Sequence, residues 1–385
     1  MSLIALGLGG SLLVESAALL LRWAPEGWVR SALGANDHPR IYLIARAVAI
    51  TSIVADLVGA AAGRGTVFTQ LSGAMPESPL ANATSLVSGW SELAVALLIA
   101  SYLGNKASRR RIFVWLLALI VTQVVLVGIT AISSPLFGFV TLVAALGAIS
   151  GVIRARYVAV TAIVLVLAWP SLFQIRNEVR QNGGFTVSQE ITAEDRLRFD
   201  LQMSAAAHHD VPAEVRQPSP LDYIRYGLVP RVLDPERPVL STGREINQYL
   251  GGVATSAYSF MTLGNVYFLD GRRAVVIYYA LWSAVVMMLL RLGGGPGPVR
   301  LALLCFVLSG PLLWSSAYPD STIALMQHTV AALPIFVLLW LTRRRATVCV
   351  SRGGRPHRHV ARHRNDAFVP SPGLPRRDRA WRQHP

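Results

Sequence analysis

The chain has 385 residues, of which 53% are hydrophobic and 15% are charged, and its formal net charge at pH 7 is +15. With a mean hydropathy of +0.45, it is too apolar for a soluble domain of this length and is typical of a protein that crosses a membrane several times. Its two cysteines, Cys305 in an apolar stretch and Cys349 near the end, exclude a disulfide framework.

Apolar stretches close to the roughly 20 residues that a bilayer core requires recur along the chain. We predict an all-α polytopic membrane protein with about nine transmembrane helices. Their expected ranges are 3–22, 41–63, 85–104, 112–132, 135–153, 157–174, 273–291, 300–317 and 322–341. The first range contains Glu15 and also has the pattern of an uncleaved signal-like segment.

Basic residues near the helix ends predict the orientation. If every helix spans, five clusters lie on one side, which is then cytoplasmic. The clusters are Arg22 with Arg30 and Arg40, Lys106 with Arg109 to Arg111, Arg154 with Arg156, Arg291 with Arg300, and Arg343 to Arg345. The N-terminus, 64–84, 133–134, 175–272 and 315–321 are then extracytoplasmic. In this orientation the largest loop of the protein lies outside the membrane.

Four parts follow from this pattern. They are a first helix group at 1–174, an extracytoplasmic segment at 175–272 between helices six and seven, the last three helices at 273–345, and a basic cytoplasmic tail at 346–385. From residue 351 the tail has nine arginines against two aspartates, and its composition predicts disorder. Such a tail is most simply a solvated extension, and we expect no nucleic-acid partner.

The extracytoplasmic segment has two halves. The first is polar, and the capping box from Thr192 to Asp195 predicts an amphipathic helix that ends near His208. The second carries Arg225, Arg231, Arg237 and Arg244 among prolines and glycines, and an apolar stretch from residue 249 to 268 that is expected to re-enter the membrane. Guanidinium groups in a turn-rich loop favour a phosphate ligand.

Residues 219–280 resemble the bacterial oligosaccharide repeat-unit polymerases, the O-antigen polymerase (Wzy-like) group. The resemblance rests on Pro230-Arg231, on Pro235-Glu236-Arg237-Pro238 and on the stretch from Leu263 to Gly271 before the next helix. Members often have Asn-Phe-Gly where this chain has Leu269-Asp270-Gly271. The resemblance implies glycosyl transfer outside the cytoplasmic membrane, with a polyprenyl-pyrophosphate-linked oligosaccharide as substrate and no cofactor. A chain-length regulator or a flippase is an expected partner.

Cleavage of a sugar–pyrophosphate bond develops negative charge on the leaving oxygen, which fixed cations stabilise. We expect Arg231 and Arg237, held by neighbouring prolines, to be the catalytic cations. The substrate-binding candidates are Arg225, Arg244, Asp234, Glu236 and Tyr249. Each arginine has a simpler alternative, which is a lipid contact or an ion pair with a nearby carboxylate.

The acceptor hydroxyl needs a base, and His328 near the outer end of the last helix is the first candidate because imidazole titrates near neutral pH. Asp234 and Glu236 are alternatives, as are His208 and His209. The chain has no Asp-x-Asp pair at an external position, so a metal-bound diphosphate is not expected.

Ionisable residues within the spans, namely Glu15, Arg46, Asp56 and Glu92, are expected to pair with one another or to line a cavity. If they line a route for substrate, the protein is a flippase or exporter of lipid-linked sugars. A ligase-like glycosyltransferase that uses the same donor and a non-catalytic assembly scaffold are further alternatives.

The predicted orientation is testable with an impermeant thiol reagent in intact cells. Ser108→Cys and Thr347→Cys should stay unlabelled because they lie in the cytoplasm, and Gln217→Cys should be labelled. Labelling of Ser108→Cys would reverse the predicted orientation.

Overall fold

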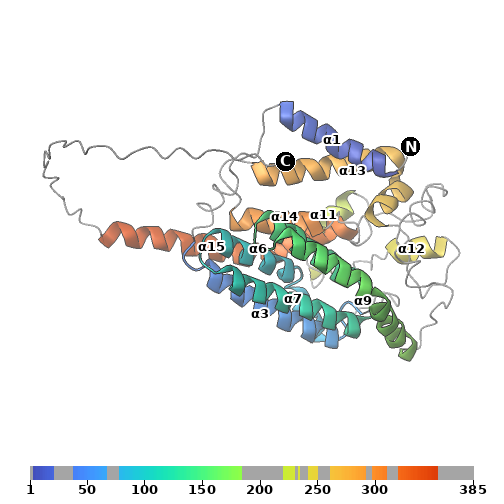
Figure 1. Cartoon of the computed structure of the whole chain (residues 1–385), viewed down its shortest axis with the longest axis horizontal. Coiled ribbons are helices and arrows are strands. Elements are labelled where there is room, and N and C mark those ends of the chain that lie inside the picture. Colours follow the sequence, from blue (N-terminus) through green and yellow to red (C-terminus); the bar gives the residue numbers. More distant parts are fainter. Residues whose placement is uncertain are drawn as a thin grey trace, which may run out of the picture. The chain divides into compact units, whose positions relative to one another are not determined.

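The computed structural model describes residues 3–20, 38–66, 78–183, 220–229, 233–234, 242–249, 261–291, 297–309 and 320–353. None of these residues lies in a strand, and the regular elements are helices (Figure 1). They are α1 (Leu3–Leu20), α3 (Ile41–Ala61), α5 (Pro79–Ser85), α6 (Trp90–Leu103), α7 (Arg109–Thr130), α8 (Ser134–Ile149), α9 (Ala155–Asn182), α11 (Pro220–Leu228), α12 (Thr242–Tyr249), α13 (Met261–Arg291), α14 (Pro298–Ser309) and α15 (Asp320–Gly353).

Six helical segments are long and apolar enough to cross a membrane. These are Ile41–Ala61, Pro79–Leu103, Arg109–Thr130, Arg156–Asn182, Thr262–Leu289 and Asp320–Arg343. The other three expected ranges fall on α1, α8 and α14, whose apolar stretches are shorter. Each of the nine expected ranges therefore overlaps a helix, whereas spanning by these three stays a prediction.

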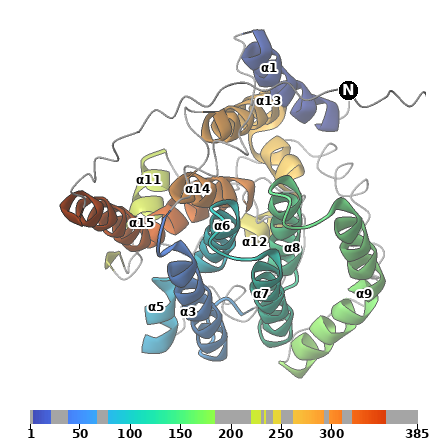
Figure 2. The same cartoon turned by 60° about the vertical axis from the view of Figure 1, so that its left-hand side comes forward.

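Helix α6 lies at the centre of the described bundle. It packs against α3, α7, α8 and α14, and α3, α6 and α7 lie side by side in Figure 2. Leu93, Leu97 and Leu98 are fully buried, and so are the alanines between them. A helix that is apolar on all sides is stable when other helices surround it, and alanine lets them approach closely.

Helix α3 shows the contrast between a protein-facing side and a lipid-facing side. Ala45, Ala49 and Ser52 are buried at helical spacing, whereas Leu43 and Val54 are exposed. A large exposed apolar side chain is unfavourable in water and neutral in lipid. The exposed leucines and valines of the long helices thus agree with a membrane location.

Helices α1 and α13 pair in parallel through small residues (Figure 1). A Cβ at Gly7 would lie 3.3 Å from Leu263, and one at Gly10 would overlap the carbonyl oxygen of Val276. Ser283 Oγ donates a hydrogen bond to Ser11 Oγ at 2.9 Å. Close backbone approach through glycine is a common basis of helix association in lipid.

Contacts between helix ends agree with the predicted alternation of direction. Arg109 Nε donates to the carbonyl oxygen of Val152 at 2.6 Å, which joins the two loop ends predicted to be cytoplasmic. Arg180 donates to the carbonyl oxygen of Ala131 at 3.2 and 3.3 Å, which joins two ends predicted to be outside. The parallel pairing of α1 with α13 is also what nine alternating spans require.

Several helix boundaries differ from the prediction, and two of them shorten the predicted segment at 175–272. Helix α9 continues to Asn182 rather than ending at 174, because Arg176 lies 4.2 Å from the Phe173 ring and Arg180 binds the end of α7. Helix α13 begins at Met261 rather than 273, because Thr262, Asn265 and Phe268 are fully buried in protein. A helix satisfies that buried backbone.

Residues 269–271, which stand where members of the resembled group often have Asn-Phe-Gly, form a kink within α13. Gly271 has φ 79° and ψ −172°, a conformation that favours glycine, and the helix resumes directly after it. Helix α15 likewise runs to Gly353, past the expected start of the tail at 346. The capping-box helix expected at 192–208 lies outside the described residues.

His38 lies buried at the end of the bundle where basic residues gather. Its Nδ1 accepts a hydrogen bond from the Arg40 backbone N–H at 3.2 Å, so the ring proton is on Nε2, which lies 3.2 Å from the carbonyl oxygen of Leu339. Burial lowers the pKa of His38 from 6.5, the hydrogen bond to Leu339 opposes this, and the charges of Arg343, Lys106 and Arg40 lower it further.

We predict that His38 makes the fold less stable in acid. The unfolded chain takes up a proton at His38 as pH falls below 6.5, whereas the folded chain does so only at lower pH, so stability declines across that interval. His38→Gln, which keeps a donor for Leu339 and does not titrate, should flatten the profile of unfolding temperature between about pH 7.5 and pH 5.

The matched control is His359→Gln in the tail, which should leave the profile unchanged. Parallel profiles for the unaltered protein and His38→Gln would show that His38 does not carry the acid sensitivity.

Candidate functional site

His328, the predicted base, belongs to α15. It lies against the residues at the start of α6 and against an aromatic side chain of α14. The Phe306 ring stands edge-on to the imidazole with centroids 5.6 Å apart. Glu92, in the first turn of α6, interacts with it electrostatically. The helix N-terminus favours a carboxylate at that position. The site therefore holds an imidazole and a carboxylate within the span.

Gly89 and Trp90 position α15 around His328. Gly89 has φ 78°, and a Cβ there would overlap the imidazole of His328, so this residue must be glycine for two independent reasons. Trp90 Nε1 donates to the carbonyl oxygen of Ala331 at 2.9 Å. The start of α6 thus contacts α15 at His328 and one turn beyond it.

The arginine-rich segment meets α15 beside His328. Gln327 Nε2 donates to the carbonyl oxygen of Tyr226 in α11 at 2.8 Å. Gly227 packs against Met326, and any side chain at Gly227 would overlap it. Helix α11 is the first described part of that segment, so two of its residues contact the two residues that precede His328.

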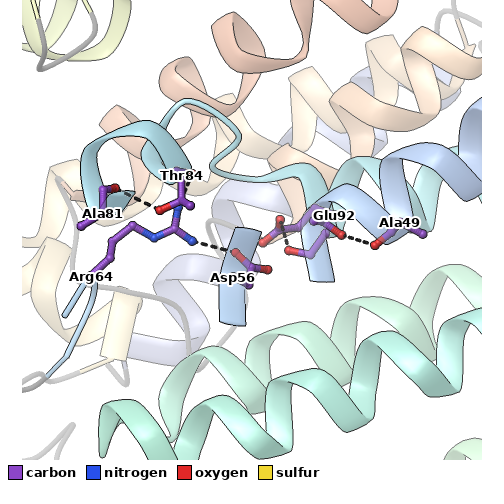
Figure 3. A network of polar contacts seen from close by, with 8 residues as sticks. Ala49, Asp56, Arg64, Ala81, Thr84 and Glu92 are labelled. Carbon is purple, nitrogen blue, oxygen red and sulfur yellow. Dashed lines mark hydrogen bonds and ion pairs between the residues drawn. The ribbon is translucent and has the colours of Figure 1, made fainter. Parts of the chain in front are cut away.

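A polar network extends from Glu92 through the first helix group, as Figure 3 shows. Ser91 Oγ donates to the Glu92 carboxylate at 3.0 Å. Asp56 of α3 interacts with Glu92 electrostatically and forms an ion pair with Arg64 at 2.8 Å. Arg64 also donates to the carbonyl oxygen of Thr84 (Figure 3). Arg64 and Asp56 are thus in direct contact, and longer-range electrostatic interactions link Asp56 to Glu92 and Glu92 to His328.

This pairing differs in part from the expected one. Asp56 pairs with Arg64 from the following turn rather than with Arg46. Arg46 lies 5.9 Å from the ring of Tyr42 and 5.8 Å from that of Trp115, so its charge faces aromatic rings. Glu15 is exposed on α1.

Arg225 and Asp234 are brought together. Arg225 Nε and its terminal nitrogen donate to the two oxygens of Asp234 at 2.8 and 2.5 Å, and Asp234 is buried. The hydrogen bond to Asp234, followed by the charge of that carboxylate, raises the pKa of Arg225. This is the ion pair that was the simpler alternative for Arg225, and it engages one edge of the guanidinium.

The structure describes some of the remaining predicted site residues and leaves others outside the described part of the chain. Tyr249 ends α12 and packs edge-on against Phe268 of α13 with centroids 5.7 Å apart. Arg244 belongs to α12, but its side chain lies outside the described residues, as do Arg231, Glu236 and Arg237 entirely. The predicted catalytic arginines therefore stay predictions, and only His328 of the catalytic set is described.

Within the described residues no three histidine, cysteine or acidic side chains gather as a metal site. The chain matches no protein-family model, no curated protein and no solved structure. The function must therefore be argued from the residues themselves.

Sequence reasoning missed Arg64, Gly89 and Trp90. Arg64 stands just after a predicted helix in a segment read as loop, and Gly89 was placed inside a predicted helix that begins at 85. A positive φ at Gly89 and the turn that precedes Trp90 are not visible in hydropathy. The one sequence feature that could have indicated this turn is Gly89 directly before Trp90, where the chain changes from polar to apolar.

We predict that Gly89→Ala disrupts the site. The left-handed conformation costs about 1–2 kcal/mol with a side chain, and the added Cβ displaces His328. The unfolding temperature of the purified protein should therefore fall.

Gly128→Ala is the matched control, because a Cβ at Gly128 in α7 meets nothing within 4 Å. Replacement there should be neutral or stabilising by up to about 1 kcal/mol. Equal effects of the two replacements would contradict the special role of Gly89.

Proposed function

We propose that this protein polymerises polyprenyl-pyrophosphate-linked oligosaccharide repeat units at the outer face of the cytoplasmic membrane. The observation that carries the proposal is the contact of α11 with α15 at Gln327, beside His328. It joins the segment that resembles repeat-unit polymerases to the histidine chosen as base. The two parts of the expected site come from distant parts of the chain, 101 residues apart at this hydrogen bond.

The position of His328 suits an outer-face reaction. It follows the start of α15 at Asp320 by two turns, which is about 12 Å along the helix. A lipid-linked substrate keeps its polyprenyl chain in the bilayer and its sugar outside, so the bond to be cleaved lies near the interface. Only a shallow site within the span can meet that bond.

The proposed reaction is a single displacement. The acceptor hydroxyl oxygen forms a bond to the anomeric carbon of the donor sugar, and the bond from that carbon to the pyrophosphate oxygen breaks. The hydroxyl proton goes to the imidazole of His328, and polyprenyl pyrophosphate leaves with the bonding electron pair. Burial of His328 disfavours the imidazolium that results, and the carboxylate of Glu92 offsets part of this cost through its electrostatic interaction with the ring.

Arg231 and Arg237 are proposed to neutralise the leaving pyrophosphate. Charge on this group grows in the transition state, so guanidinium contacts lower the barrier more than they favour binding. Arg225 has a supporting part in this scheme, because it pairs with Asp234, and in the sequence Arg231 stands between these two residues and Arg237 three residues after them.

We predict that Arg231→Ala and Arg237→Ala each reduce polymer formation by about 10²–10³-fold, comparable with loss of one preorganised donor to a developing anion. Lysine at either position should restore activity only partly, because it lacks the planar two-pronged geometry. The measurement is polymer length together with accumulated lipid-linked single repeat units at equal protein level.

Arg216→Ala is the control, since it removes the same charge from the polar half of the segment. Arg180 is unsuitable as a control because its guanidinium binds the end of α7. Normal polymer from both alanine variants would rule out the pyrophosphate role.

A second candidate is a flippase or exporter of lipid-linked sugars. The series Arg64, Asp56, Glu92 and His328 favours it, because ionisable residues inside spans often mark substrate or proton routes. The leaflet in which single repeat units accumulate in a deletion strain separates the two. Accumulation in the outer leaflet supports the polymerase, and accumulation in the inner leaflet supports the flippase.

A ligase-like enzyme shares the donor and the leaving group with the polymerase. It differs in its acceptor, which is a lipid core rather than a second repeat unit. Loss of long chains with single units still attached to the core indicates a polymerase, and loss of all attachment indicates a ligase.

A further inference from the structure

A cavity of about 370 Å³ opens between the beginnings of α3 and α7, away from His328. Its lining residues are Tyr42, Ser108, Arg110, Arg111, Val114 and Trp115. Both helices begin at the end of the bundle where His38 meets the charges of Arg40, Lys106 and Arg343. The cavity thus lies at a membrane boundary, on the side predicted to be cytoplasmic.

The lining is cationic. Arg110 and Arg111 contribute two exposed guanidinium groups, and Ser108 adds a hydroxyl. Arg46 approaches from α3, where it lies near the rings of two lining residues, Tyr42 and Trp115. None of the described lining residues carries a carboxylate, so an anion can enter without meeting a like charge.

The surface beside the cavity is apolar. Val114 is 57% exposed, and Leu117 and Val121 continue its exposed side along α7 with 49% and 52%. On α3, Ile50 and Val54 are also exposed, about as far from the start of their helix as Leu117 and Val121 are from the start of α7. These side chains face lipid and offer a path for acyl chains that run from the cavity into the bilayer.

Aromatic and basic residues have complementary parts at such a boundary. Tyrosine and tryptophan are favoured at headgroup level, where one side of the ring is apolar and the other is hydrated. Basic pockets between transmembrane helices on the cytoplasmic side bind phosphate-containing headgroups. Here both features line one cavity.

We propose that this cavity binds the phosphate headgroup of an anionic membrane phospholipid, with the acyl chains along the exposed sides of α3 and α7. Arg110 and Arg111 bind the phosphate oxygens, and Ser108 donates a hydrogen bond to one of them. Arg46, one turn further along α3 than Tyr42, adds a positive charge. The site is separate from the glycosyl-transfer site and does not depend on that proposal.

The test uses the purified full-length chain in neutral detergent. Retained lipid is counted by native mass spectrometry after addition of dioleoylphosphatidylglycerol, of dioleoylphosphatidylcholine or of glycerol 1-phosphate. The unaltered protein should bind phosphatidylglycerol in preference to phosphatidylcholine. The double variant Arg110→Gln/Arg111→Gln should bind it about 25-fold more weakly, or about fivefold for each arginine removed.

The matched control is Arg154→Gln/Arg156→Gln, which removes two exposed arginines from another loop on the same predicted side. It should keep the affinity of the unaltered protein. Equal weakening in both double variants would mean general attraction of lipid to positive charge and would overturn the proposal.

Two further outcomes also decide it. If glycerol 1-phosphate displaces the phospholipid at equal concentration, the acyl chains contribute nothing and the site is one for a free phosphate. If the unaltered protein binds the two phospholipids equally, the cavity has no headgroup preference. Either result contradicts an anionic phospholipid site.

Discussion

The burial of α6 on every side is the constraint on which the rest of the described bundle depends. A helix without a polar face is stable only when other helices cover it, and α3, α7, α8 and α14 do so. Since its middle is wholly apolar, the polar residues of α6 lie at its two ends, with Ser91 and Glu92 in the first turn and Ser101 and Tyr102 in the last. Glu92 is the charged residue among them, and it lies three residues after Gly89.

That place is also where α15 and α11 meet. Gly89 and Trp90 fix the position of α15 around His328, and Gln327 and Met326 hold α11. Placing an ionisable residue inside a span costs free energy. Here the Phe306 ring packs against His328, and the carboxylate of Glu92 interacts with it electrostatically. The packing of an apolar helix thus leads to a defined polar site at its end.

The sequence predicted where the apolar helices lie, whereas the contacts around the candidate site depend on how these helices pack. Hydropathy locates an apolar helix because length and composition suffice, so each expected range overlaps a helix. It could not predict that α9 continues to Asn182, because that depends on Arg180 meeting the carbonyl oxygen of Ala131, 49 residues earlier. The Asp56–Arg64 pair and the contact of Gly89 with His328 likewise arise only when helices meet. His328 was chosen as the candidate base because an ionisable residue in a span is unusual, and its role stays a prediction.

Reconstitution tests whether this chain by itself joins repeat units by glycosyl transfer, as we propose. The purified protein is placed in vesicles with a polyprenyl-pyrophosphate-linked repeat unit and no other protein, and the products are separated by length. We expect chains of two or more units, with one polyprenyl pyrophosphate released for each linkage formed. Single units that cross the bilayer without any gain in length would contradict it.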